Sequence, residues 1–118
     1  MVLDIEGYFN ATGSNKIPKL FLPIKKIKEM EIGKVTGTIR AKVLRKPDKV
    51  NTFMNIVIED DAKDQIQCCF FGDKAHEYKN FLMVGGWYCF ENPILQMNNR
   101  LNIIELKITA NSKITKEK

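Results

Sequence analysis

Residues 33–108 decide the fold, and they read GKVTGTIRAKVLRKPDKVNTFMNIVIEDDAKDQIQCCFFGDKAHEYKNFLMVGGWYCFENPILQMNNRLNIIELKI. Short runs in which apolar and polar residues alternate predict five strands, because neighbouring side chains of a strand point to opposite faces. The expected strands are residues 34–44, 53–59, 65–71, 87–91 (resuming at 94–95) and 101–108. A short amphipathic helix is expected at residues 72–83, between the third and fourth strands.

The third strand carries the most informative alternation. Its core face is expected to hold Phe70. Phe71 then falls on the opposite face, because two adjacent residues of a regular strand cannot both point into the core. Gln67 shares that outer face with Phe71. The predicted inward-facing residues of the second, third and fourth strands are Met54, Ile56, Ile58, Ile66, Cys68, Phe70, Tyr88 and Phe90.

The order of these elements predicts an all-β domain with one short helix. Five short strands with a helix between the third and the fourth are typical of the OB-fold, a five-stranded Greek-key barrel. Gly37 in the middle of the first strand predicts the bend that such a small barrel needs. We expect a flexible N-terminal segment at residues 1–15, the OB-fold domain at residues 16–110 and a C-terminal tail or linker at residues 111–118.

The charge of the chain is positive and uneven. The formal net charge is +5 and the pI is about 9.1, which favours a polyanionic partner. Residues 16–49 hold eleven Lys and Arg against three acids, or +8. The alternative interpretation of this segment is a solvated basic surface.

The sequence offers no catalytic, cofactor or metal motif. Phosphate-binding, hydrolase and zinc-protease patterns are missing, so we expect a protein that is not an enzyme and needs no cofactor. Cys68, Cys69 and Cys89 form no C-x-x-C pair, and the single His76 cannot complete a zinc site. We expect reduced thiols, no metal and no membrane segment, since no apolar run approaches about 20 residues.

Aromatic rings and cations are the residue types that bind single-stranded nucleic acid, because bases stack on rings and phosphates attract cations. Phe71 is the candidate stacking ring, and Phe53 is a weaker second candidate. The alternative for Phe71 is burial under the following helix. Gln67 and Gln96 are candidates for hydrogen bonds to bases. The candidate phosphate contacts are Arg40, Lys42, Arg45, Lys46, Lys49 and Arg100.

Residues 17–110 resemble the single-stranded-DNA-binding domains of the large subunit of replication protein A. The resemblance lies in a Pro-Ile lead-in at residues 23–27 and in three strands, TIRAKV at residues 38–43, FMNIVIED at 53–60 and QIQCCFF at 65–71. It also includes VGGWYCF at residues 84–90. Phe71 falls at the family's stacking aromatic, whereas the second aromatic of the family is replaced by Leu101 or Asn102.

This resemblance implies a nuclear protein that binds single-stranded DNA in replication, repair or telomere maintenance. A telomerase-associated ciliate paralogue of the same subunit fits as well. The implied partners are single-stranded DNA and further OB domains or subunits of a larger complex. Two alternatives stay open, an RNA-binding module in a larger complex and an OB domain that binds another protein.

Overall fold

The computed structural model describes residues 20–117, so the flexible segment predicted at residues 1–15 lies outside the described residues. Two helices are present in this part of the chain, α1 (Ile24–Ile27) and α2 (Asp73–Lys79). The strands are β1 (Gly33–Lys34), β2 (Thr38–Arg45), β3 (Phe53–Glu59), β4 (Gln65–Phe71), β5 (Trp87–Glu91), β6 (Ile94–Asn98), β7 (Ile103–Ile108) and β8 (Lys113–Lys116). Neither helix is long and apolar enough to cross a membrane.

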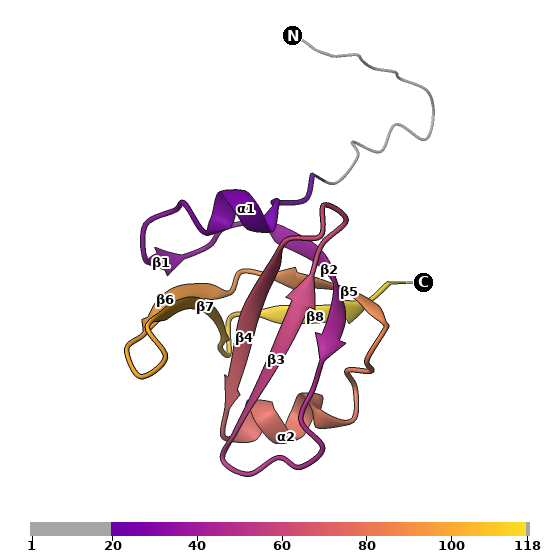
Figure 1. Cartoon of the computed structure of the whole chain (residues 1–118). Coiled ribbons are helices and arrows are strands. Elements are labelled where there is room, and N and C mark those ends of the chain that lie inside the picture. Colours follow the sequence, from indigo (N-terminus) through magenta and orange to yellow (C-terminus); the bar gives the residue numbers. More distant parts are fainter. Residues whose placement is uncertain (1–19, 118) are drawn as a thin grey trace, which may run out of the picture.

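The strands form one sheet that closes into a barrel (Figure 1). Their order in the sheet is β1-β6-β7-β4-β3-β2-β5-β8. β5 pairs with β2, β6 pairs with β7, and only residues 92 and 93 separate β5 from β6 in the chain. The short connection therefore links the end of the sheet that contains β2 and β5 to the end that contains β6 and β7. All pairs are antiparallel except β4 with β7, which run parallel. This is an OB-like fold, mostly β with a short helix.

The prediction of five strands is wrong in number, because residues 20–117 form eight. The expected fourth strand is split into β5 and β6 at Asn92, whose φ is +53°, and at Pro93, which lacks a backbone N–H. The expected first strand is interrupted before β2 at Gly37, whose φ is +136°. A Cβ at Gly37 would lie 2.8 Å from Leu22 Cδ1, so a larger residue would clash there.

The C-terminal residues also differ from the expectation of a tail or linker. Lys113–Lys116 form β8, which pairs with the edge of β5 in antiparallel register. Ile114 of β8 lies opposite Phe90 and is buried. The segment has one buried apolar residue among polar neighbours, and such a short pattern does not predict a strand. The strand follows only from the edge of β5, which offers a pairing partner in the folded structure.

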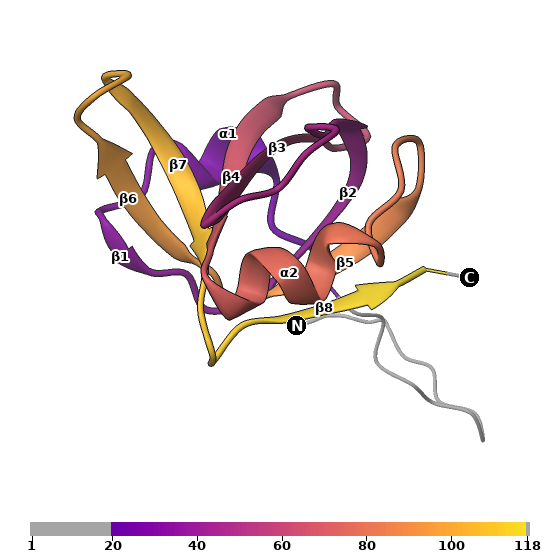
Figure 2. The same cartoon turned by 90° about the horizontal axis from the view of Figure 1, so that it is seen from below.

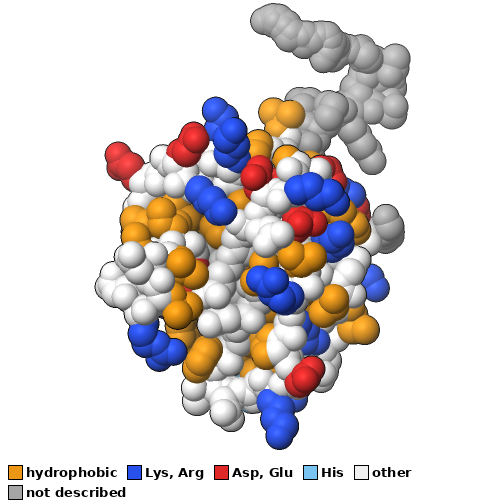
Figure 3. All heavy atoms as spheres, in the orientation of Figure 1, with side chains coloured by type: hydrophobic (Ala, Val, Ile, Leu, Met, Phe, Trp, Pro, Cys, Tyr) orange, Lys and Arg blue, Asp and Glu red, His pale blue; other side chains and the backbone are white. Residues whose placement is uncertain are grey.

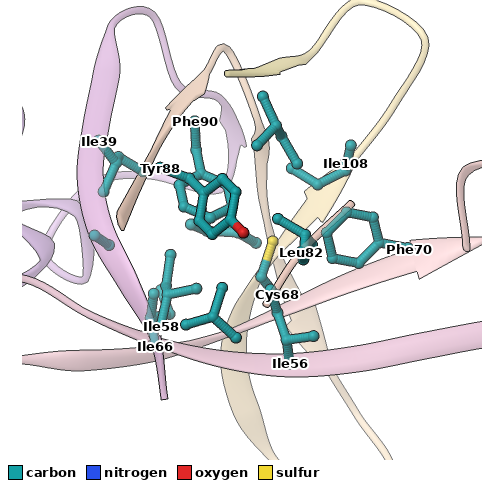
Figure 4. Close-up of a cluster of buried hydrophobic side chains, with 14 of the residues drawn as sticks. Ile39, Ile56, Ile58, Ile66, Cys68, Phe70, Leu82, Tyr88, Phe90 and Ile108 are labelled. Carbon is teal, nitrogen blue, oxygen red and sulfur yellow. The ribbon is translucent and has the colours of Figure 1, made fainter. Parts of the chain in front are cut away.

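The core lies inside the barrel, and the predicted inward-facing residues fill it (Figure 4). Phe70, Tyr88 and Phe90 are the largest of its fully buried side chains. α2 lies at the end of the barrel where the β2–β3 loop also lies (Figures 1 and 2). The helix ends at Lys79, earlier than predicted, and buries Ala75 and Tyr78 against the core. Burial of these apolar side chains is the dominant favourable contribution to folding.

The lead-in segment is fixed to the opposite end of the barrel. Ile24 and Ile27 of α1 are fully buried, and the Ile24 backbone N–H donates to Asp60 Oδ2 at 2.9 Å. Asp60 Oδ1 accepts two further backbone N–H groups, those of Ala62 and Asp64, at 3.1 Å each. The acidic β3–β4 turn is therefore a structural element of the fold.

Candidate nucleic-acid interface

The outer face of β3, β4, β7 and β6 carries a regular grid of side chains. The strand registers set one row across the four strands, in the order Val57, Gln67, Glu105 and Gln96. A parallel row near the end of β4 places Phe53 of β3 directly opposite Phe71. The backbone alternation points all of these side chains away from the core. We call this surface the outer face.

Two aromatic rings are exposed at one end of the outer face. Phe71 is 48% exposed and Phe53 is 45% exposed, so α2 covers neither ring. Their ring centroids lie 6.4 Å apart with an interplanar angle of 42°. Lys107 Nζ of β7 lies 5.1 Å from the centroid of the Phe71 ring, within the range of a cation–π contact. The rings and the cation form a surface on which a base could stack beside a phosphate.

A buried carboxylate occupies the middle of the outer face. Glu105 is 3% exposed. Its Oε1 accepts hydrogen bonds from Gln67 Nε2 at 2.7 Å and from Asn98 Nδ2 at 3.1 Å. Its Oε2 accepts from Gln96 Nε2 at 2.7 Å and from Cys69 Sγ at 3.4 Å. Four donors, two from β4 and two from β6, therefore surround one carboxylate of β7, and we call this group the Glu105 network.

The Glu105 network changes two pKa values in opposite directions. Burial raises the pKa of the Glu105 carboxyl, but the hydrogen bonds from Gln96, Asn98, Gln67 and Cys69 outweigh burial, and the net pKa is lowered. Burial and the neighbouring carboxylate raise the pKa of the Cys69 thiol to about 12. At neutral pH the carboxylate is therefore ionised and the thiol is protonated.

Acidification is expected to destabilise the protein partly through Glu105. Its pKa is lower in the folded state than in the unfolded state, so its contribution is present above the unfolded pKa of about 4.3 and is lost as the pH falls through the folded pKa. Urea unfolding at neutral pH and near pH 3 measures this effect. Wild type should lose more unfolding free energy on acidification than Glu105→Gln, and equal losses would contradict the assignment.

Two predicted cations of β2 are already engaged by carboxylates. Arg40 forms ion pairs with Glu117 and with Asp61, the latter at 3.0 Å. The Glu117 hydrogen bond, partly opposed by burial, is the main cause of the raised pKa of Arg40. The Arg40 guanidinium also lies 4.3 Å from the Trp87 ring centroid. Lys42 Nζ lies 3.7 Å from Glu59 Oε1. The charges of both cations are thus partly offset.

The other predicted cations lie in the two connections that flank the outer face. Arg45 and Lys49 are exposed at the end of β2 and in the β2–β3 loop. Lys46 in that loop donates from Nζ to the Leu82 carbonyl at 2.7 Å. Thr52 at the end of the loop accepts from the Gly72 N–H at 2.7 Å, which holds the loop near the end of β4. Arg100 is exposed in the β6–β7 turn.

The β6–β7 turn lies toward the opposite end of the outer face. It precedes Ile103, and the parallel β4–β7 register puts Ile103 at the level of the start of β4. Asn98 Oδ1 accepts the backbone N–H groups of Arg100 and Leu101 at 3.1 Å each, which fixes the turn. The outer face therefore runs from the aromatic pair to a turn that carries a cation.

Lys and Arg side chains are spread over the visible surface rather than gathered in one patch (Figure 3). They alternate there with apolar side chains. Within residues 20–117 no group of three or more His, Cys, Asp or Glu side chains is arranged to hold a metal ion.

Sequence reasoning missed two residues of the outer face, Glu105 and Lys107. The alternation of the last predicted strand contains the signal, because Ile104, Leu106 and Ile108 face inward and the residues between them face outward. The contacts of Glu105 depend on the pairing of β7 with both β4 and β6. Sequence alternation alone does not give that pairing.

The fold is similar to that of proteins solved with DNA. Fission yeast Pot1, solved with single-stranded DNA, matches at TM-score 0.64 and 11% identity over 83% of this chain. A replication protein A heterotrimer bound to single-stranded DNA matches at TM-score 0.63 and 15% identity over 82% of it. A murine DNA-binding protein bound with double-stranded DNA matches at TM-score 0.66 and 14% identity over 98% of it.

These likenesses establish the OB-like fold. The present chain spans 39% of the Pot1 chain, 24% of the replication protein A chain and 62% of the murine chain. No protein-family profile matches the sequence, and no curated protein sequence matches it.

Proposed function

We propose that this chain is a non-catalytic domain that binds single-stranded DNA on its outer face. The observation that carries the proposal is the pair of exposed rings, Phe53 and Phe71, with Lys107 beside them on adjacent strands. Stacking on aromatic rings and attraction of phosphates to nearby cations are the two contributions that single-strand binding requires. The proteins of similar fold solved with single-stranded DNA support the same choice.

The phosphate contacts in this proposal come from three parts of the surface. Lys107 acts at the aromatic end. Arg45 at the end of β2 acts together with Lys46 and Lys49 of the β2–β3 loop, and Arg100 acts in the β6–β7 turn. Arg40 and Lys42 remain proposed contacts whose charges are partly offset by acids. Gln67 and Gln96 offer polar atoms to bases between the two ends.

The biological setting that we propose is replication, repair or telomere maintenance in the nucleus, as a domain of a larger assembly. The sequence resemblance to the large subunit of replication protein A supports a replication role, and the fold likeness to fission yeast Pot1 is compatible with a telomere role. A single OB domain binds weakly alone, and linked domains raise the effective concentration. Further OB domains or subunits are therefore the proposed partners.

Fluorescence anisotropy with labelled strands tests the function. The probes are oligothymidine, a mixed DNA sequence, a G-rich repeat, matched RNA and a DNA duplex, each at low and at physiological salt. We expect single-stranded DNA to bind more tightly than RNA or duplex, with affinity falling steeply as salt rises. A tighter complex with RNA would favour the RNA-binding alternative, and no binding to any strand at low salt would favour a protein partner.

Lys107→Ala is expected to reduce the salt dependence of single-strand binding. Removing one phosphate contact should lower the magnitude of the slope of log K against log salt by about 0.7, since each contact to a single strand contributes roughly that amount. Lys113→Ala is the matched control, because Lys113 is an exposed strand lysine on β8, at the far edge of the sheet. Equal slopes for the two variants would remove Lys107 from the phosphate contacts.

A further inference from the structure

The Glu105 network fixes the orientation of two amides on the outer face. An ionised carboxylate only accepts hydrogen bonds, so the atom that each amide turns toward Glu105 must be its nitrogen. Gln67 Nε2 lies 2.7 Å from Glu105 Oε1, and Gln96 Nε2 lies 2.7 Å from Glu105 Oε2. The assignment of amide nitrogen and oxygen, which is open for many glutamines, is settled here by chemistry.

The amide oxygens of Gln67 and Gln96 consequently point away from the carboxylate. Both side chains are half-buried and lie on the outer face. Within the described residues, neither oxygen accepts a hydrogen bond from the protein. Asn98, the third amide of the network, differs, because its oxygen already accepts two backbone N–H groups of the β6–β7 turn. Within the described residues, the middle of the outer face thus presents two amide oxygens as free acceptors. The two amide nitrogens already donate to Glu105, and that of Gln96 also lies 3.5 Å from Cys69 Sγ.

The four bases differ in how well their edges suit such a surface. Guanine presents two adjacent donors, N1–H and the N2 amino group, on one edge. Thymine presents one donor, N3–H, between two carbonyl acceptors. Adenine and cytosine each place an acceptor nitrogen beside their amino donor. An acceptor facing an acceptor leaves both groups unpaired and costs free energy.

We propose that the outer face discriminates among bases and prefers guanine over thymine at the position between Gln67 and Gln96. Gln67 and Gln96 are the residues that contact the base, and Glu105 is a positioning residue that holds their oxygens outward. This inference rests on the proposed function, because it assigns a base preference to the same surface.

The preference can be measured with a short oligothymidine and the same oligomer carrying one central guanine. We expect the guanine strand to bind on the order of tenfold more tightly, the size of discrimination that one well-placed base contact provides. Inosine in place of guanine lacks the N2 amino donor and should lose most of the gain. 7-Deazaguanine alters only the opposite edge of the base and should keep it.

Two variants separate base reading from general affinity. Gln96→Met keeps the length of the side chain but offers only a weak thioether acceptor in place of the amide oxygen, and it should lower the ratio of guanine to thymine affinity several-fold. Glu105→Gln replaces a group that only accepts hydrogen bonds by an amide that can also donate. The Gln67 and Gln96 amides can then exchange the positions of their nitrogen and oxygen atoms. This variant should bring the ratio of guanine to thymine affinity close to one, and the affinity for thymine should rise, because a negative charge has left the surface proposed to bind phosphates.

The outcomes distinguish the inference from the function on which it rests. Equal binding of the guanine and thymine strands by wild type would overturn the guanine preference and leave single-strand binding intact. A guanine preference that persists in folded Glu105→Gln, verified by thermal unfolding, would overturn the positioning role of Glu105. Failure to bind any strand would contradict the proposed function, and the base preference with it.

Discussion

Replacing Phe71 by alanine is expected to weaken binding to single-stranded DNA by about 5- to 150-fold. A base stacked on an aromatic side chain contributes about 1–3 kcal/mol to the free energy of binding, and each 1.4 kcal/mol corresponds to about a tenfold change in affinity. Phe71 is 48% exposed and lies beside Phe53 and Lys107. Anisotropy titrations of wild type and Phe71→Ala with oligothymidine at low salt measure the loss directly.

Phe81→Ala is the matched control for this experiment. Phe81 is 40% exposed, similar to Phe71, but it follows α2, packs against Tyr78 and Tyr88, and belongs to none of the strands of the outer face. We expect Phe81→Ala to lower the thermal midpoint and to leave DNA affinity unchanged. Phe71→Ala should instead lower DNA affinity and change the thermal midpoint little. Unchanged DNA affinity in Phe71→Ala would remove the aromatic pair as a stacking site and favour a protein partner for this surface.

Replacing the adjacent Phe70 by alanine is expected to lower the free energy of unfolding by about 3–5 kcal/mol. Phe70 is fully buried in the barrel and its ring lies 5.7 Å from that of Tyr78. The loss combines the removed apolar contacts with the cavity that remains, as found for buried phenylalanines in general. A loss of this size is a large fraction of the stability of a small domain. Urea unfolding of Phe70→Ala and Phe71→Ala beside wild type provides the comparison.

The two neighbouring phenylalanines therefore report on two different properties of the domain. Phe71→Ala should change the unfolding free energy by much less than Phe70→Ala, because half of the Phe71 ring is already in water. A similar loss for both variants would mean that Phe71 is packed in solution. In that case it could not serve as an open stacking surface.

The alternation of residues 65–71 was sufficient to separate Phe70 from Phe71, because the period of a strand is two wherever one face is buried. The same reasoning placed the core residues of β3 and β5 correctly. It also placed an interruption after residue 91 of the fourth strand, where the structure breaks between β5 and β6, but it did not predict that the resumed part pairs with β7 as a separate strand. β8 was missed because its pairing partner, the edge of β5, exists only in the folded barrel.

The candidate site was less predictable than the fold. Arg40 is an outward-facing cation in the sequence, and its ion-pair partner Glu117 lies 77 residues away in the chain. The Glu105 network joins donors from β4 and β6 to an acceptor on β7, so it depends on the β4–β7 register and on the β6–β7 register. Sequence alternation predicts on which face of a strand a side chain lies. It does not predict ion pairs or hydrogen bonds between residues that meet only when distant strands pair.

The parallel pairing of β4 with β7 has a consequence for the time course of folding. The β3–β4 and β6–β7 hairpins pair neighbouring segments and are expected to form early, whereas the β4–β7 and β2–β5 pairs join distant segments and are expected to form later. Gln67 and Gln96 belong to different hairpins, and Glu105 holds both only after β4 meets β7. The outer face is thus completed together with the barrel itself, so in a partly folded chain we expect the aromatic pair without the ordered amides of Gln67 and Gln96.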